Sequence, residues 1–177
     1  LERLRDMLGD VIGEGESALV FTQFAEVGGQ LERHLRDTLD CPVFYLHGGV
    51  PAAKRERMIA EFQDTDTGPG VFILSLRAGG VGITLTKANH VFHFDRWWNP
   101  AVEDQATDRA FRIGQRKNVF VHKFITLGTL EERIDRLIEE KKQVASLIVG
   151  NDESWLTRLD NETFKELIAL NRMAVLE

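Results

Sequence analysis

The sequence has only one cysteine, Cys41, so it offers neither a disulfide pair nor a cysteine-clustered zinc site. This scarcity excludes the class of small secreted domains that disulfides hold together, and it is typical of a protein in a reducing cytosol. Long hydrophobic runs are also missing, because the apolar stretches are strand-sized and interrupted by charge, so no segment is predicted to span a membrane. Residues 1–20 mix acids with bases, and no signal peptide is predicted.

Two motifs of nucleotide-hydrolysing enzymes are absent as well. The sequence contains no G-x-x-x-x-G-K-[ST] run, whose backbone and lysine would hold the β and γ phosphates of a nucleotide. The only Asp-Glu pair, at 152–153, follows Gly150, which we predict to cap a long helix, so the pair is not an acidic metal-binding box at a strand end. No nucleophile with its base is apparent, and the histidines lack metal-ligand spacing. The chain is therefore not predicted to hold a nucleotide or a metal ion by itself.

With 177 residues, 43% of them hydrophobic, the chain is long enough to bury one core without disulfides or metals. Its net charge is −6, but residues 42–123 carry 11 Lys and Arg against 8 Asp and Glu, while the rest of the chain carries 11 against 20. Contact with nucleic acid is therefore predicted to be local and to come from the middle of the chain. The start inside a helical pattern, without Met, is typical of a fragment of a larger protein.

Helical and strand patterns alternate from one end of the chain to the other. Apolar residues at helical spacing and short β-rich runs are separated by glycine-containing or charged loops. Such alternation predicts a parallel sheet covered by helices on both faces, with ligands at the carboxyl ends of the strands. The predicted strands span 18–24, 43–46, 71–74, 91–94 and 119–125, and the predicted helices span 1–12, 26–39, 51–62 and a stretch that starts at Pro100.

The last third of the chain is predicted to be helical. Thr129-Leu130-Glu131-Glu132 has the spacing of a capping box, which opens a long amphipathic helix over 129–149, and a further helix is predicted over 162–172. We predict one domain over residues 1–150, followed by a helical tail over 151–177 that packs on or beside it.

Gln105, Arg109 and Arg112 follow one another at spacings of four and three residues, which places them on one face of a helix. The arginine guanidinium is always charged and its planar fork matches phosphate, so this face is a candidate phosphate site. An ordinary solvated surface is the alternative, because three acids on the same stretch can pair with the arginines. These acids are Glu103, Asp104 and Asp108.

Several predicted strands end in residues that can bind a ligand. Gly79, Gly80 and Gly82 follow one strand, where they let the backbone approach a phosphate, although a tight structural turn explains them equally well. Thr22-Gln23 ends another strand, and His47-Gly48-Gly49 follows a third. A basic patch or simple solvation accounts for the cations that follow, which are Lys54, Arg55 and Arg57. Two adjacent tryptophans, Trp97 and Trp98, are interpreted as packing anchors, with base stacking as the alternative.

Taken together and in order, these motifs resemble the second RecA-like lobe of Swi/Snf-type ATPases in helicase superfamily two. The resemblance covers essentially the whole chain, and the tail resembles that of bacterial members. It implies a RecA-like three-layer α/β/α fold. The segments that carry it are VFTQF, LHGG, LSLRAGGVGITLT, FDRWWNPAVEDQATDRAFRIGQ and GTLEERI.

The resemblance implies part of an ATP site that is completed by another lobe. Arg109 and Arg112 match the arginines that reach the triphosphate, the last acting as arginine finger, and Gln105 belongs to the same segment. Gly80 and Gly82 match the glycine-rich motif next to the nucleotide. ATP with Mg is then held mainly by the first RecA-like lobe of the same parent chain, and the fragment alone is expected to be inactive as a DNA-dependent ATPase.

The resemblance also implies contacts with the backbone of double-stranded DNA, without sequence-specific reading. Thr84 departs from the pattern, because family members commonly have Asn there. The expected location is the bacterial cytosol or nucleoid, or the nucleus in a eukaryote. Two other functions stay open: a non-catalytic module that binds nucleic acid or protein, and an RNA helicase lobe. The residues expected at the DNA-tracking surface are Thr22, Gln23, His47, Gly48, Ser75, Arg77 and Gly79.

Overall fold

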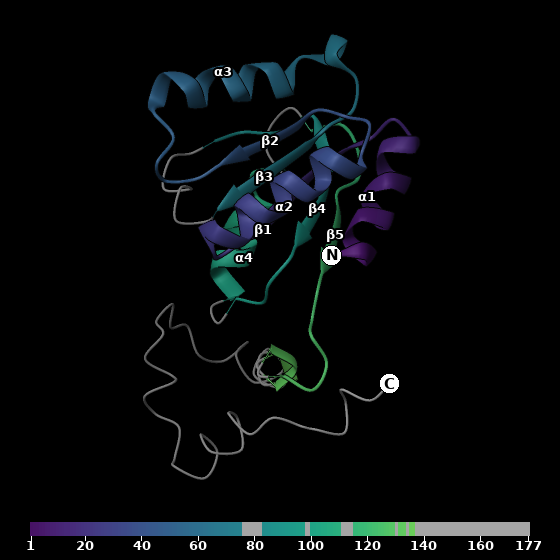
Figure 1. Cartoon of the computed structure of the whole chain (residues 1–177), viewed down its shortest axis with the longest axis vertical. Coiled ribbons are helices and arrows are strands. Elements are labelled where there is room, and N and C mark those ends of the chain that lie inside the picture. The colour runs from purple at the N-terminus through teal and green to yellow at the C-terminus, as the bar shows by residue number, and fades with distance from the viewer. Residues whose placement is uncertain (76–82, 98–99, 111–114, 130, 134, 137–177) are drawn as a thin grey trace.

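A computed structural model describes residues 1–75, 83–97, 100–110, 115–129, 131–133 and 135–136 of the chain (Figure 1). Predicted elements outside these ranges are not discussed further, among them the helix over 162–172 and the tail domain over 151–177. The described elements are α1 (Glu2–Gly13), β1 (Ser17–Thr22), α2 (Ala25–Thr38), β2 (Val43–Leu46), α3 (Ala52–Gln63), η1 (Thr65–Thr67), β3 (Val71–Ser75), β4 (Ala88–His93), α4 (Pro100–Thr107) and β5 (Phe120–Lys123).

The five strands form one sheet in the order β2-β3-β1-β4-β5, and every neighbouring pair is parallel. In the central strand, Val20 of β1 lies in register with Ile73 of β3 and with Phe92 of β4. β1 to β4 are buried along their length, whereas β5 is largely exposed at the edge. The parallel sheet predicted from the alternating pattern is confirmed.

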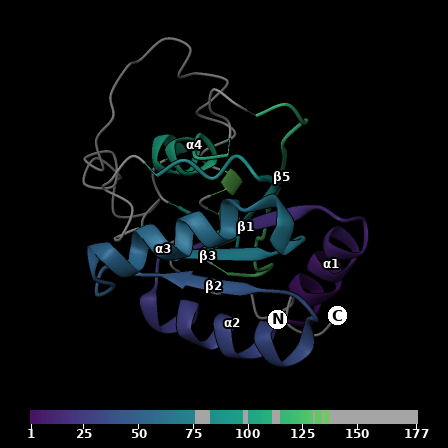
Figure 2. The ribbon, with the colours of Figure 1, turned by 90° about the horizontal axis from the view of Figure 1, so that it is seen from above.

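Helices cover both faces of this sheet (Figure 2). Alternate residues of β1 show how the faces divide, since Leu19 and Phe21 join one buried cluster while Ala18 and Val20 join the other. The first cluster includes Phe62 of α3 and Ala106 of α4, and the second includes residues of α1 and α2. The predicted three-layer α/β/α fold class is thus confirmed.

Most element boundaries lie within two residues of the predicted ones; the start of β4 differs by three residues, at Ala88 rather than at residue 91, and two smaller differences have physical causes. β1 ends at Thr22 rather than at residue 24, because the Gln23 N–H donates to the Asp95 carboxylate instead of continuing the ladder. Pro51 is the N-cap of α3 and not its first residue, since its ψ angle of 147° is not helical, while its carbonyl oxygen accepts from the N–H groups of Lys54 and Arg55 at 3.0 and 2.9 Å. α4 starts at Pro100 as predicted.

The C-terminal end of α4 differs most from the sequence prediction. The helix ends at Thr107, and Arg109 lies in the turn that follows. The prediction that Gln105 and Arg109 share one face of a helix is therefore wrong. The Arg109 and Ala110 N–H groups donate three residues back, to the carbonyls of Ala106 at 3.2 Å and Thr107 at 3.0 Å. The Arg109 carbonyl oxygen accepts from the Leu85 N–H at 3.0 Å, a tertiary bond.

At the far end of the described chain, Thr129 behaves as the predicted cap. Its Oγ1 accepts from the Glu131 N–H at 3.3 Å and donates to the Thr126 carbonyl oxygen at 2.6 Å. The Glu132 carboxylate accepts from the Gly128 N–H at 2.7 Å, one residue before the position that the capping-box pattern requires. Residues 131–133 and 135–136 are helical, and the rest of the predicted helix over 129–149 lies outside the described residues.

Gly28 of α2 is required by the close approach of Tyr45, and this contact gives a first prediction. A β-carbon at Gly28 would lie 2.5 Å from the Tyr45 ring, whereas one at Gly29 would meet nothing within 4 Å. Tyr45 is fixed by a 2.6 Å hydrogen bond from its hydroxyl to the Ala25 carbonyl oxygen. We expect Gly28→Ala to lower the free energy of unfolding by about 1–3 kcal/mol. Gly29→Ala, the matched control, is expected to raise it by up to about 1 kcal/mol, because alanine favours helix.

Urea unfolding of the 177-residue chain measures both effects. Equal changes in the two variants would contradict the close packing of Tyr45 on α2.

Candidate functional site

The carboxyl ends of the parallel strands meet at one edge of the sheet, where ligands of such folds gather. β1 ends there at Thr22 and β3 at Ser75, and these two residues are register partners. Gln23 and His47 follow the ends of β1 and β2 at the same edge, and Asp95 follows the end of β4. The edge therefore collects the described residues that were predicted to face DNA.

Asp95 organises the end of β1. The Thr22 hydroxyl donates to Asp95 Oδ2 at 2.5 Å. The Gln23 backbone nitrogen lies 3.0 and 3.1 Å from the two carboxylate oxygens and donates to them. The pKa of Asp95 is raised because burial of this carboxyl outweighs the donors from Thr22 and Gln23. The Gln23 side chain donates from Nε2 to the Arg96 carbonyl oxygen at 2.8 Å. The loop after β4 thus holds both the backbone and the side chain of Gln23.

The structure changes the roles predicted for Thr22 and Ser75. Both side chains were expected at the DNA-tracking surface, but the residues are only 0% and 2% exposed. Thr22 is turned inward because Asp95 accepts its hydroxyl proton, and Ser75 is the last residue of a strand that is flanked on both sides. Gln23 is half-buried. A DNA contact at this strand end stays a prediction for Gln23, with Thr22 orienting the loop.

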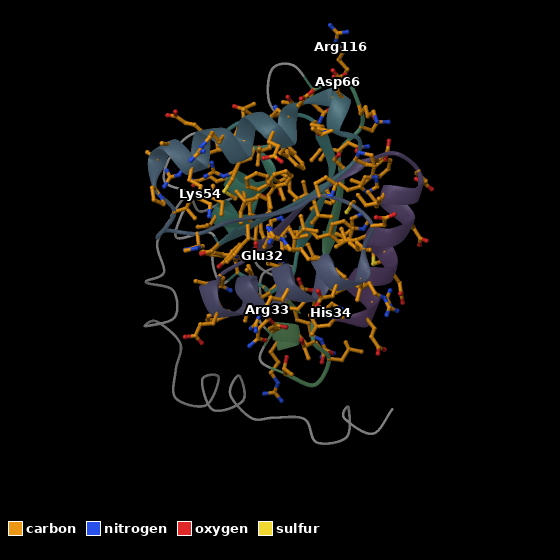
Figure 3. The ribbon with its side chains drawn as sticks, turned by 45° about the horizontal axis from the view of Figure 1, so that its top comes forward. Glu32, Arg33, His34, Lys54, Asp66 and Arg116 are labelled. Carbon is orange, nitrogen blue, oxygen red and sulfur yellow. The ribbon has the colours of Figure 1, made fainter. Side chains whose placement is uncertain are left out.

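The segment after β2 is the second predicted contact at this edge. His47 is half-buried and Gly48 is exposed, and His47 Nδ1 accepts from the Gly49 N–H at 3.2 Å. The His47 ring lies 5.0 Å from the Tyr45 ring, centroid to centroid, so the packing of Tyr45 on α2 supports this loop. Lys54, labelled in Figure 3, is exposed at the start of the helix that follows.

Arg109 does not lie with these residues at the carboxyl edge. α4 begins beyond this edge and runs back over the sheet, and the carbonyl of Arg109 meets Leu85 ahead of β4. Arg109 is half-buried, and Gln105 is exposed. Arg112 lies outside the described residues, as do Arg77, Gly79, Gly80 and Gly82.

A buried ion cluster, which the sequence did not reveal, fixes the start of α4. We call it the Glu103 cluster, and its members are Arg96, Glu103, Lys123 and Asp135. Glu103 binds the Arg96 Nη1 and, at 2.7 Å, the Lys123 Nζ, while its other oxygen accepts from the Trp97 N–H at 3.0 Å. Arg96 also donates from Nε and Nη2 to Asp135 at 2.8 and 2.7 Å. The side chains of Arg96 and Glu103 are each only 1% exposed.

The Glu103 cluster answers one alternative left by the sequence. Glu103 was considered as a surface partner of the arginines on its own helix, but it pairs with Arg96 and Lys123. The sequence signal that could have found this pair is weak, because Arg96 and Glu103 are seven residues apart across Pro100. Trp97 is half-buried, and Trp98 lies outside the described residues.

His93, the last residue of β4, bonds the other end of α4. Its Nε2 lies 3.0 Å from the Thr107 hydroxyl, and its ring stacks on Phe21 with centroids 5.6 Å apart. Burial lowers the pKa of His93 to about 4, and the nearby Lys123 and Arg96 add to this effect, whereas Glu103 opposes it. His93 is therefore neutral at pH 7.

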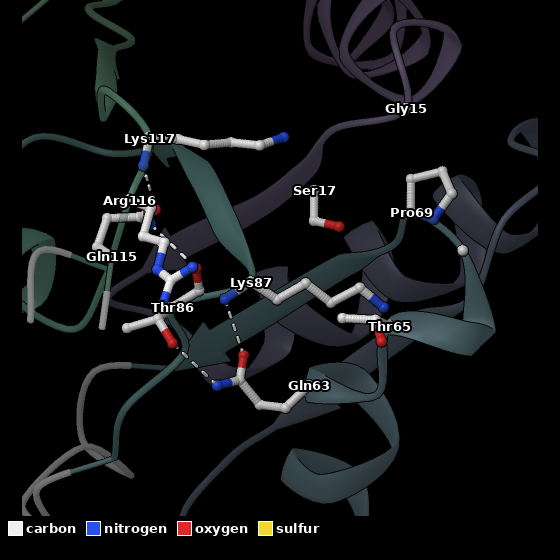
Figure 4. Close-up of a pocket in the computed structure, with 11 residues that line it drawn as sticks. Gly15, Ser17, Gln63, Thr65, Pro69, Thr86, Lys87, Gln115, Arg116 and Lys117 are labelled. Atoms are coloured by element: carbon white, nitrogen blue, oxygen red, sulfur yellow. Dashed lines mark hydrogen bonds between the residues drawn. The ribbon is translucent and has the colours of Figure 1, made fainter. Parts of the chain in front are cut away.

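A pocket of about 450 Å³ lies at the opposite edge, among the segments that precede β1, β3, β4 and β5 (Figure 4). Its cations are largely engaged in contacts of the fold. Lys87 Nζ donates to the Asp64 carbonyl oxygen at 2.5 Å and to Thr67 Oγ1 at 3.0 Å, and Lys117 pairs with Glu16 at 3.3 Å. Among the described residues, none of those singled out in the sequence for ligand binding lines this pocket.

Within the described part of the chain, no group of three or more His, Cys, Asp or Glu side chains is arranged to hold a metal ion. The helices of that part are also too short or too polar to cross a membrane. Neither observation extends to residues 137–177.

The described fold is that of a RecA-like α/β lobe, and comparison with known proteins identifies its family. The helicase conserved C-terminal domain family matches residues 1–114, so the chain belongs to that family. In sequence it is 44% identical to the putative ATP-dependent helicase/translocase YwqA of Bacillus subtilis (strain 168), over 98% of this chain but 18% of the relative. The chain thus spans about a fifth of the length of that relative.

Solved structures place it more closely within the family. The Sulfolobus solfataricus SWI2/SNF2 ATPase core domain matches with a TM-score of 0.79 and 40% identity, covering 96% of this chain and 34% of that one. The same ATPase core in complex with dsDNA matches with a TM-score of 0.77 and 38% identity, over 96% and 35%. The resemblance inferred from the sequence motifs, to the second RecA-like lobe of Swi2/Snf2-type ATPases, is therefore confirmed.

Proposed function

We propose that the chain is the second motor lobe of an ATP-dependent, double-stranded-DNA translocase of the Swi2/Snf2 type. The observation that carries this proposal is a pair of hydrogen bonds through Arg96, which connects the strand end predicted to contact DNA with the start of α4. Gln23 donates to the Arg96 carbonyl oxygen, and the Arg96 guanidinium binds Glu103 at the start of α4. The strand end predicted to contact DNA is thus linked to the helix that leads to Arg109.

The residues of the arginine segment fit a nucleotide phosphate but do not form a complete nucleotide site. Arg109 and Arg112 would neutralise charge on the transferred phosphoryl group, and Gln105, Gly80 and Gly82 are the further candidates for contact with the nucleotide. No phosphate loop is present in the sequence, so the first lobe would hold ATP and Mg. The bound magnesium ion would neutralise phosphate charge.

DNA would be gripped through its phosphates, without reading of bases. Gln23 and the His47-Gly48 loop are the described candidates for this contact, together with Arg77 and Gly79 after β3. Backbone contact of this kind explains how a lobe with a net charge of −6 binds DNA, because only a local group of donors is needed. Closing and opening of the two lobes would move these contacts along the duplex. The place of action is then the bacterial cytoplasm or nucleoid, or the nucleus in a eukaryote.

ATP hydrolysis by the full-length parent protein tests this function. We expect duplex DNA to stimulate turnover more than single-stranded DNA or RNA, and the isolated 177-residue chain to hydrolyse ATP negligibly. Stronger stimulation by RNA would instead support an RNA helicase lobe. A parent protein without any ATP turnover would support a binding module that has kept the fold.

A further inference from the structure

Glu103 is the centre of the ion cluster at the start of α4. Its two carboxylate oxygens accept from three donors on two other segments: the Arg96 side chain and the Trp97 N–H in the loop after β4, and Lys123 on β5. Burial alone would raise the pKa of Glu103, but the bonds from Lys123, Arg96 and Trp97 hold it below its usual value. Glu103 is therefore ionised at neutral pH, and all three contacts are charge-assisted.

The rest of α4 offers little that would fix its position. Ala106 is its buried apolar residue, and Ala110 follows in the turn, at positions 106 and 110 on the same side as Glu103. A methyl group buries little area, so contacts of two alanines give about 1–2 kcal/mol and no direction. Glu103 in contrast is held from three directions, which defines both the rotation of α4 about its axis and its depth on the sheet.

A contribution to stability alone does not account for the Glu103 cluster. A buried ion pair is often no better for stability than an apolar pair of the same volume, because removing both charges from water is costly. The arrangement is directional, however, and two more directional bonds follow it along the chain. Thr107 meets His93, and the Arg109 carbonyl oxygen meets Leu85. From Glu103 to Arg109 the backbone is thus anchored at three points within seven residues.

We propose that Glu103 is a positioning residue, which sets the place from which the arginine segment reaches the nucleotide. This inference rests on the proposed function, since it assumes that Arg109 acts in ATP hydrolysis. Glu103 itself is buried and touches neither nucleotide nor DNA. Its effect on hydrolysis is transmitted through α4.

The test measures ATP hydrolysis by the full-length parent protein at saturating duplex DNA. We expect Glu103→Gln to lower kcat by about 10–100-fold, because a shift of about 1 Å in a reacting group has an effect of this size. The KM for ATP and the DNA concentration at half-stimulation should change less than about twofold, since the groups that bind are unchanged. Asp104→Asn is the matched control: Asp104 is the next residue, is exposed, and should leave kcat unchanged.

A double variant separates positioning from general destabilisation. If Glu103 acts through the arginine segment, Glu103→Gln combined with Arg109→Ala will be about as slow as Arg109→Ala alone. Multiplied losses, or an unchanged kcat in Glu103→Gln, would overturn the inference. If Arg109→Ala and Arg112→Ala are both fully active, the proposed function fails instead, and the two failures are therefore distinguishable.

A milder variant covers the case in which Glu103→Gln does not fold. Lys123→Met removes one donor to Glu103, and Lys123 is 30% exposed. The buried Glu103 carboxylate keeps Arg96 as its partner, so no buried charge is left unpaired. We expect a smaller fall in kcat, again without a change in the KM for ATP. An unchanged kcat in a folded Lys123→Met protein, together with a Glu103→Gln protein that does not fold, would assign Glu103 a purely structural role.

Discussion

In the full-length parent protein, Arg109→Ala is expected to slow DNA-stimulated ATP hydrolysis by about a thousandfold, and Arg112→Ala by at least as much. The reason is that each guanidinium neutralises charge that develops on the phosphoryl group in the transition state. A thousandfold corresponds to about 4 kcal/mol of transition-state stabilisation. The measurement is steady-state turnover with saturating ATP and duplex DNA.

Arg33→Ala is the matched control for these variants. Arg33 is an exposed arginine on α2, on the face of the sheet opposite to α4 (Figure 3). It should retain normal turnover, which shows that loss of an arginine as such is harmless. Thermal melting of all variants checks that the fold is intact. Near-normal hydrolysis by both Arg109→Ala and Arg112→Ala would be incompatible with an arginine finger in this segment.

Acid is expected to destabilise the chain through His93. The pKa of His93 is lowered to about 4 from its ordinary 6.5, so the unfolded chain binds this proton and the folded chain does not between these values. The contribution of neutral His93 to the free energy of unfolding is therefore fully present above pH 6.5 and is lost as the pH falls towards 4. The pKa difference of about 2.5 units corresponds to a loss of about 3 kcal/mol between pH 7 and pH 4.

Urea unfolding of the 177-residue chain at a series of pH values measures this loss. His93→Gln, whose amide can still bond Thr107, should remove most of the dependence between pH 4 and 6.5. Glu16, whose pKa is lowered to about 2 by hydrogen bonds from Asn89 and His90, acts only below pH 4.5 and stays as an internal reference. An identical pH dependence in the His93→Gln chain would show that His93 is not the titrating group.

The architecture was predictable from sequence because its signals are local and repeated. Each buried strand is a short apolar run between polar loops, and the strand over 43–46 was placed within its observed bounds. The start of α4 was equally clear, since proline is favoured in a first helical turn. The order of the strands in the sheet was not predicted, because which strands become neighbours depends on contacts far apart in the chain.

The partners of the site residues depend on such distant contacts, and these partners were not predicted from the sequence. Arg109 leaves the helix because its carbonyl bonds Leu85, 24 residues earlier, which no helical periodicity reveals. Thr22 turns inward because its hydroxyl binds Asp95, which lies in the loop after β4, 73 residues later in sequence. Glu103 was considered, in the alternative interpretation, as a partner of the arginines on its own helix, whereas tertiary packing brings it to Arg96. The motif residues were recognisable, but their partners were not.

The central claim is that this lobe belongs to a motor that moves along duplex DNA and uses the arginine segment to do so. Displacement of a third DNA strand from a duplex by the full-length parent protein tests the claim most directly. We predict ATP-dependent displacement by the unaltered protein and none above background by Arg109→Ala, with equal binding of the duplex by both. Equal displacement by the two proteins, or no displacement by the unaltered protein despite ATP hydrolysis on duplex DNA, would contradict it.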